Sequence, residues 1–365
     1  MTSRSKGASK IKKPTISDVA TLAGVVPSTV SHVVNNTAPI TEETKRKVLS
    51  AIEELNYSPN AMARALRQEK SRLIGVVLQD IASEFYAKCA ASILEAARAD
   101  NYVVLVCDAT YDNNVIDASV RALTERRVEG FIFVGGRDDA DILRYIQVSG
   151  VPIVLGDRYH EGFSSVRFDN KSTVNNIVCA LYASGYRRFA YIGEPLSVQV
   201  NLAHRFEGFL EGMECCNIPT TDYTVVLDEA LHKKPKTSTG FEMFCKYFQD
   251  LPREKMPQVI VTSNDMIAHG VIAAIRRSGL RVPEDIAVVG FDDISISEFF
   301  EPSLTTVSQD EKELGKSCYQ SLKCLINGGK SESHILLPQK IVARESAIIP
   351  DEVLRTYTTI NEIRE

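Results

Sequence analysis

The chain has 365 residues, of which 44% are hydrophobic and 24% charged, and this composition is typical of a folded globular protein rather than a disordered one. Its apolar runs are shorter than the roughly 18 residues that a membrane span needs, and the basic start MTSRSKGASKIKKP lacks the apolar stretch of a secretory signal. The formal net charge of -5 by itself argues against a nucleic-acid partner.

The charge is divided unevenly along the chain. Residues 1–72 hold 12 Lys and Arg against 6 Asp and Glu, a net of +6, and the remaining residues hold 30 against 41, a net of -11. A basic head on an acidic body indicates two parts with different partners.

The basic head has the pattern of three short helices. Thr15 and Asp18 have the spacing of a capping box, and the helix that they begin is expected to break at Gly24. A second helix is expected over residues 27–35, where proline suits the first helical position, and a third follows Thr41. Such an arrangement is a helix-turn-helix unit, whose second helix reads a DNA groove. A small helical bundle with a solvated polar face is the alternative, and the local charge of +6 disfavours it.

The stretch TISDVATLAGVVPSTVSHVVNN, followed by ELNYSPNAMARAL, resembles the headpiece of the LacI/GalR family of bacterial transcription regulators. The resemblance implies a hinge from Asn60 to about Leu66 that folds into a helix when two protomers meet on DNA. It also implies that Leu66 inserts between base pairs in the minor groove, where an apolar wedge bends the duplex.

Two positions of the headpiece depart from the family pattern. Val26 replaces the usual serine and cannot cap the second helix through its side chain, so Pro27 is expected to compensate by fixing φ. His32 replaces the usual arginine and, when neutral, offers a single donor, so the preferred operator should differ at that base pair. We expect Pro27, Ser28 and His32 to set sequence preference. The side chains expected to hold phosphates are Thr15, Ser17, Thr29, Ser31 and Asn35.

From Leu73 onward, apolar strands alternate with amphipathic helices. The expected strands are 73–79, 102–107, 130–135, 151–156, 188–193, 258–263 and 286–292. Continuous apolar strands separated by helices imply parallel sheets that are covered on both faces, and the length of the pattern predicts two doubly wound subdomains.

This part resembles the type I periplasmic-binding-protein fold, which forms the regulatory core of the same family, and the resemblance then extends from about Ser17 to Ser346. It implies a small effector in a cleft and three crossings between subdomains, expected near 165–170, 300–304 and 330–334. The fold class expected is therefore an all-α helix-turn-helix headpiece plus an α/β core of two doubly wound subdomains. The expected divisions are a basic tail (1–13), a helix-turn-helix domain (14–59), a hinge helix and linker (60–72), an effector-binding and dimerisation core (73–350) and a C-terminal tail (351–365).

Polar residues follow several of these strands, at the edge where open parallel sheets bind ligands. Matched to the family's motifs, Asp157, Asn264 and Asp292 fall where effector-binding residues usually lie, as does Arg205 in a predicted helix. Phe85 and Tyr86 match an aromatic pair that often borders the pocket. Each has a structural alternative: a turn or cap for Asp292, a salt bridge for Arg205, loop ordering for Asp157 and Asn264, and the core for Phe85.

This set of side chains suits a polyol. Carboxylates and amides can bridge adjacent hydroxyls, a guanidinium donates in a fixed fork, and an aromatic ring can cover the apolar face of a sugar. Because the set has one strong cation, the sequence favours a neutral sugar over a sugar phosphate or a purine.

The function expected is a sequence-specific DNA-binding transcriptional regulator, a repressor whose operator affinity a sugar effector controls. The expected partners are double-stranded DNA with a near-palindromic operator, the effector and a second copy of the chain, without a membrane, in the bacterial cytoplasm at the nucleoid. The tail PDEVLRTYTTINEIRE is too short for several heptads, which favours a dimer over a tetramer.

A sugar-binding transport or chemoreceptor protein with the same core is the alternative, and the helix-turn-helix disfavours it. No nucleophile–base motif, metal cluster or phosphate loop stands out, so no enzyme, cofactor or metal is expected. The eight cysteines are interpreted as reduced buried thiols, with the vicinal pair Cys215-Cys216 as a disfavoured redox-sensitive alternative.

Overall fold

The computed structural model describes residues 14–35, 37–57, 71–109, 113–136, 140–197, 199–230, 234–329 and 332–358. The chain divides into two compact units, Met1–Ser71 and Arg72–Glu365. The expected basic tail and the expected hinge, with Leu66, lie outside the described residues.

The first unit is the expected three-helix headpiece. Its helices are α1 (Ile16–Ala23), α2 (Pro27–Asn35) and α3 (Glu42–Glu54). The capping box is present, because the Thr15 side chain accepts from the Asp18 backbone N–H and the Asp18 side chain accepts from the Thr15 backbone N–H. Gly24 ends α1 in the left-handed region at φ +67°, which glycine adopts without strain. The small core consists of Val19, Ala20, Val30, Val48 and Ala51.

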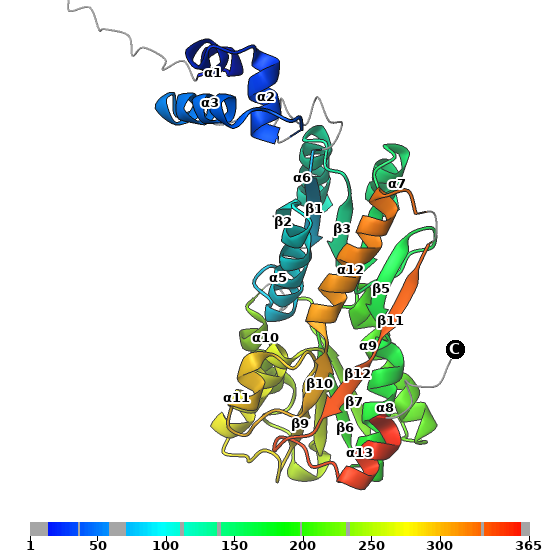
Figure 1. Cartoon of the computed structure of the whole chain (residues 1–365). Helices are drawn as coiled ribbons and strands as arrows, with labels where there is room; N and C mark the ends of the chain where they lie inside the picture. Colours follow the sequence, from blue (N-terminus) through cyan, green and yellow to red (C-terminus); the bar gives the residue numbers. More distant parts are fainter. Residues whose placement is uncertain are drawn as a thin grey trace, which may run out of the picture. The chain divides into compact units, whose positions relative to one another are not determined.

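The first subdomain of the core contains a six-stranded parallel sheet in the order β11-β5-β4-β3-β1-β2 (Figure 1). Its strands are β1 (Leu73–Leu78), β2 (Val103–Asp108), β3 (Phe131–Val134), β4 (Ile153–Gly156), β5 (Ser164–Phe168) and β11 (His334–Leu337). Helices α5 (Glu84–Ala99) and α12 (Glu311–Ile326) pack on one face, and α6 (Asn113–Glu125) and α7 (Ala140–Val148) pack on the other. Both faces are therefore covered, which explains why its central strands are apolar throughout.

The second subdomain contains a four-stranded parallel sheet in the order β7-β6-β8-β9. Its strands are β6 (Phe189–Gly193), β7 (Tyr223–Leu227), β8 (Val259–Thr262) and β9 (Ala287–Val289). Single bridges join β9 and the loop after it to β10 (Thr306–Gln309), which pairs antiparallel with β12 (Gln339–Val342). The helices of this subdomain are α8 (Asn170–Ala183), α9 (Val200–Cys215), α10 (Lys236–Tyr247), α11 (Asp265–Arg277) and α13 (Asp351–Thr358), and short 3-10 turns are η1 (Arg253–Lys255) and η2 (Ser295–Glu298).

The chain passes between the subdomains at Asp169, Asp310 and Pro338. The first crossing agrees with the prediction of 165–170. The predictions for the other two are wrong. The segment after 300–304 first forms β10 in the second subdomain, and the segment after 330–334 first forms β11 beside β5 in the first.

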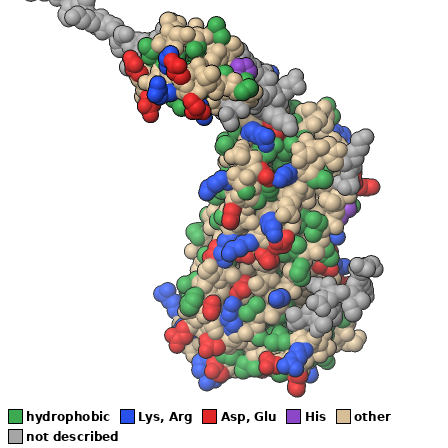
Figure 2. Space-filling model, viewed as in Figure 1, with side chains coloured by type: hydrophobic (Ala, Val, Ile, Leu, Met, Phe, Trp, Pro, Cys, Tyr) green, Lys and Arg blue, Asp and Glu red, His purple; other side chains and the backbone are tan. Residues whose placement is uncertain are grey.

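Three further observations concern the C-terminal tail, the helices and the surface charges. Within the expected C-terminal tail, residues 351–358 form α13, which packs against the hydrophobic cluster of the second subdomain. None of the helices in the described ranges is long and apolar enough to cross a membrane. On the face shown in Figure 2, acidic and basic side chains are interspersed over the core.

Candidate functional site

Helix α2 carries the side chains expected to contact DNA. Pro27, Ser28 and His32 are exposed, and Thr29 and Ser31 are half-buried. The opposite face of α2 carries Val30, which is fully buried in the headpiece core. Helix α2 is thus amphipathic: one face packs in the headpiece core, and the polar face is accessible to a DNA groove, as in a recognition helix.

The neighbouring expected phosphate ligands lie at the start of α1, where Thr15 and Ser17 are exposed. Asn35 ends α2, and its side chain is outside what the structure describes. Val26, 59% exposed, starts α2 through its carbonyl oxygen, which accepts from Thr29 N at 2.9 Å. The helix therefore begins without a side-chain contribution from Val26, as its apolar side chain requires.

The His32 ring is held in place by a neighbour. Its Nδ1 lies 2.9 Å from Thr37 Oγ1. This contact engages Nδ1 and leaves Nε2 as the ring nitrogen that can face a base edge.

Arg205 lies at the centre of a buried polar cluster in the core. Its Nε donates to Asn170 Oδ1 at 3.1 Å, and its Nη1 donates to the carbonyl oxygen of Ser263 at 2.6 Å. Nη2 lies 3.3 Å from Asp292 Oδ1, and the guanidinium carbon lies 3.7 Å from the centre of the Phe291 ring. Arg205 is 6% exposed, so these contacts replace the water that a buried guanidinium loses.

Asp157 brings the first subdomain into the same cluster. It directly follows β4, at φ +55°, and is 2% exposed. Both its carbonyl oxygen and its Oδ2 accept from Asn201 Nδ2 at 2.6 Å, so the end of β4 is attached to α9. Burial raises the pKa of Asp157 to about 7, Arg205 opposes that rise, and the nearby Asp292 adds to it.

Asp292 follows β9 and occupies φ +120°, a conformation that favours glycine. Its Oδ1 accepts from Gln309 Nε2 at 3.0 Å in addition to facing Arg205. Burial raises its pKa to about 7, and Arg205 opposes the rise. Two sets of contacts thus lie close together: Arg205 with Asn170, Asp292 and Gln309, and Asp157 with Asn201. The Asp157 carboxyl is near enough for Arg205 and Asp292 to influence its pKa. We call these six residues the Arg205 cluster.

Asn264 and Phe85 have structural roles in addition to any contact with a ligand. Asn264 caps α11 by accepting from Ile267 N at 3.0 Å, and its Nδ2 donates to Glu194 Oε2 at 2.9 Å. Phe85 is 4% exposed and lies in the hydrophobic cluster between α5 and the first sheet, edge-on to Phe168. Effector contact by either residue stays a prediction.

The sequence interpretation missed several polar residues of this region. Asn201 is one turn before Arg205 on α9, and that i, i+4 spacing is a signal that could have identified it. Asn170 and Gln309 lie beside two of the crossings and gave no such signal. Tyr86 was not missed, since it is the second residue of the matched aromatic pair, and it reaches the second subdomain by donating its hydroxyl to Gln199 Oε1 at 3.3 Å.

Buried polar atoms of this region that have no hydrogen-bond partner among the described residues include Gln79 Nε2, Asp157 Oδ1, Asn170 Nδ2 and Tyr191 Oη. An unsatisfied buried polar group is costly, and native proteins keep few of them. Two of these atoms, Asp157 Oδ1 and Asn170 Nδ2, belong to the Arg205 cluster, and they supply one acceptor and one donor. This is the arrangement that a ligand with hydroxyl groups would complete.

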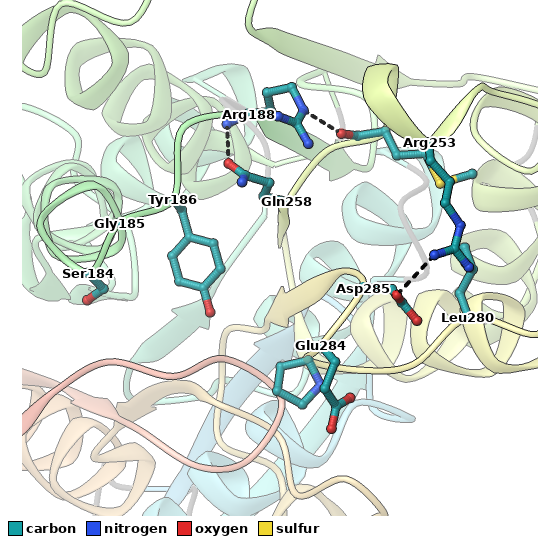
Figure 3. A pocket seen from close by; sticks show the side chains of 11 residues that line it. Ser184, Gly185, Tyr186, Arg188, Arg253, Gln258, Leu280, Glu284 and Asp285 are labelled. Carbon is teal, nitrogen blue, oxygen red and sulfur yellow. Dashed lines mark hydrogen bonds and ion pairs between the residues drawn. The ribbon is translucent and has the colours of Figure 1, made fainter.

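A different cavity, of about 410 Å³, opens at the opposite edge of the second sheet (Figure 3). It is lined in part by Arg188, Gln258 and Asp285, which precede β6, β8 and β9. Arg188 Nε donates to the Met256 carbonyl oxygen, and Arg253 points to Asp285 at 3.6 Å. This edge holds the amino ends of the strands, whereas ligands of open parallel sheets bind at the carboxyl ends.

Comparison with known proteins supports the same division of the chain. Residues 15–60 match the family profile "Bacterial regulatory proteins, lacI family", and residues 178–347 match "Periplasmic binding protein-like domain". The HTH-type transcriptional repressor PurR of Haemophilus influenzae (strain PittEE) is 30% identical over 338 residues, which are 91% of this chain and 98% of that protein. The HTH-type transcriptional regulator RegA of Clostridium saccharobutylicum is 32% identical over 336 residues, 91% of this chain and 99% of its own.

A solved structure extends the likeness to the whole fold. The lac repressor dimer bound to operator and the anti-inducer ONPF is 30% identical, covers 92% of this chain and 99% of its own, and has a TM-score of 0.79. The chain belongs to the LacI family, with a helix-turn-helix headpiece and a periplasmic-binding-protein-like core. These relatives are transcriptional regulators and not enzymes, which confirms the expectation that this chain is not an enzyme.

Proposed function

We propose that this protein is a repressor that binds a near-palindromic operator as a homodimer. When a neutral sugar or polyol binds the Arg205 cluster, the affinity of the protein for the operator changes. The headpiece supplies the DNA contacts, because α2 carries a polar exposed face. A related solved structure is a dimer bound to operator together with a small ligand, which supports the same partners here. A DNA partner implies a place at the nucleoid, in the cytoplasm.

The observation that carries the effector proposal is the buried, incompletely satisfied cluster at Arg205. Asp157 Oδ1 and Asn170 Nδ2 are buried without a partner among the described residues, one on each subdomain. Adjacent hydroxyls of a polyol could donate to the first and accept from the second.

Charge argues for a neutral ligand. Arg205 already faces Asp292, and Lys236 lies 3.8 Å from both Asp80 and Glu194. A phosphate bound at Arg205 or at Lys236 would have to take that cation from its carboxylate, whereas a hydroxyl can be added there without breaking a pair.

The same cluster suggests how a ligand would act at a distance. Asp157 belongs to the first subdomain and Arg205 to the second, so a ligand that contacts both binds one relative arrangement of the subdomains better than another. Contacts such as Ser295 Oγ to Glu84 Oε1, between η2 and α5, also join the subdomains and would change with that arrangement. The effector then alters operator affinity through this difference alone.

A thermal-shift screen against neutral sugars, sugar phosphates and nucleobases tests the ligand class. We expect at least one neutral sugar to raise the Tm, because selective binding to the folded state stabilises it by about 2.7 kcal/mol at 100 times the Kd. The shift should be lost in Arg205→Lys, which cannot form the planar fork, and kept in Arg253→Lys, whose side chain is 76% exposed. Hits confined to phosphates or to nucleobases would refute the neutral-sugar proposal.

Operator binding tests the regulatory part of the proposal. With the sugar identified above, fluorescence anisotropy at fixed salt should show a change of operator Kd of about 5- to 150-fold in the wild-type protein. The same sugar should leave the Kd of Arg205→Lys unchanged. A salt-stable tetramer in gel filtration, or a sugar that binds without altering the operator Kd, would contradict the model of a sugar-controlled dimer.

A further inference from the structure

Three cysteines of the second subdomain gather where α8 meets the end of α9. Cys179 lies on α8, Cys215 is the last residue of α9, and Cys216 caps that helix. Although 37 positions separate them, Cys216 Sγ lies 3.7 Å from Cys179 Sγ. All three are free thiols, and none is fully buried.

The contacts distinguish the two adjacent cysteines. Cys216 is half-buried and faces Cys179, whereas Cys215 is exposed, with a long contact of 3.9 Å from Asn175 Nδ2 to its Sγ. The fold therefore pairs Cys216 with a cysteine of the neighbouring helix and not with its neighbour in sequence. This pairing differs from the vicinal one that the sequence suggested.

We propose that Cys179 and Cys216 form a reversible disulfide with each other, and that a small-molecule disulfide such as oxidised glutathione is the oxidant. The Cys216 thiolate attacks one sulfur of the oxidant, whose S–S bond breaks and releases one thiol. The Cys179 thiolate then attacks the Cys216 sulfur of the mixed disulfide and releases the second thiol. The protein loses two protons and two electrons and gains one S–S bond, and the oxidant is reduced to two thiols.

The burial of the two thiols makes the rate of the reaction depend on pH. Burial raises the pKa of the Cys216 thiol, and burial together with the nearby Cys216 raises the pKa of Cys179 to about 12. Only the thiolate attacks, so the rate of bond formation increases as the pH rises. The 3.7 Å approach of the two sulfur atoms, and not these pKa values, is what supports the bond.

The bond would fix two helices that both contribute to the Arg205 cluster. Helix α8 begins with Asn170 and α9 carries Arg205, and these two side chains are already joined at 3.1 Å. A covalent link at the far end of the same helix pair restricts the unfolded chain and so stabilises the second subdomain. This inference is independent of the identity of the effector.

The test uses the full-length protein, reduced, desalted and incubated with oxidised glutathione at pH 8.5 or in buffer alone. We expect the intact mass to fall by two hydrogen atoms, a peptide linked through Cys179 to appear, and dithiothreitol to reverse both changes. The oxidised protein should have a higher Tm than the reduced protein.

Single variants identify the bond, because Cys215 and Cys216 are adjacent and share a peptide. Cys179→Ser and Cys216→Ser should abolish the link and the Tm increase, and Cys215→Ser should keep both. Circular dichroism checks that each variant folds. If a variant does not fold, the linked peptides of the wild-type protein still identify the bond. Stable glutathione adducts without a link, or a Cys215-Cys216 bond in the wild-type protein, would overturn the proposal.

Discussion

Asp157 and Asp292 are two buried carboxyls near one arginine, Arg205, and their protonation makes the stability of the core depend on pH. Burial raises the pKa of each carboxyl from 3.8 to about 7. A raised pKa means that the folded protein holds these protons more tightly than the unfolded chain does. Their contribution to stability is therefore present below about pH 4 and is lost as the pH rises through about 7.

The first prediction follows from that sign. The free energy of unfolding of the wild-type protein should fall from pH 5 to pH 7.5 relative to Asp157→Asn, in which one of the two carboxyls no longer titrates. Urea unfolding of both proteins at several pH values measures the difference. His269, whose pKa burial lowers to about 4, is present in both proteins, so its contribution to the pH profile cancels. Parallel pH profiles for the two proteins would show that Asp157 does not hold a raised pKa.

A second prediction at the residue scale concerns His32. His32→Ala should lose about 1–3 kcal/mol of specific binding and relax one position of each half-site. Because Thr37 Oγ1 holds the ring through Nδ1, Thr37→Val should weaken discrimination at the same position by a smaller amount. Binding-site selection with each variant measures both effects, and an unchanged consensus for His32→Ala would exclude this role.

Among the elements, helix α1 depends most clearly on its first residues. Its capping box satisfies backbone donors that the first turn of a helix leaves unpaired. Thr15→Ala removes one half of that box and should cost about 1 kcal/mol of headpiece stability.

The third prediction uses a matched threonine on the same helix. Thr15→Ala should speed amide hydrogen exchange in α1 about 5-fold, whereas Thr21→Ala, whose hydroxyl only donates to the Ser17 carbonyl oxygen, should leave it nearly unchanged. The Tm of the core should be the same in both variants. Equal exchange rates in the two variants would mean that the cap contributes little to α1.

The elements also show which patterns a sequence reveals. The apolar segment 73–79 was predicted as a strand and forms β1, because a parallel strand covered on both faces needs an apolar side chain at nearly every position. Five strands in the described part of the chain were not predicted: β5, β7, β10, β11 and β12. Of these, β5 (SSVRF) and β10 (TVSQ) mix polar and apolar residues, so their sequences lack the continuous apolar run by which the other parallel strands were recognised.

For the whole molecule, the division at Ser71 matches the change of charge along the sequence. The fourth prediction is that a fragment of residues 1–71 keeps weak DNA affinity with a steep salt dependence, and that residues 72–365 keep effector binding and dimerisation without DNA affinity. Anisotropy at several salt concentrations and sedimentation of the two fragments measure this. DNA binding by the larger fragment alone would contradict the division.

The sequence by itself determined the headpiece and the class of the core, because capping residues, apolar strands and the charge division are local or compositional properties. It also singled out Asp157, Arg205 and Asp292 as candidates, since residues after parallel strands and a matched helical motif point to one edge of the sheets. Only the tertiary structure joined these residues to Asn170, Asn201 and Gln309, and paired Cys216 with Cys179. Those contacts depend on how helices and crossings pack between residues far apart in the chain, which neither spacing nor composition records.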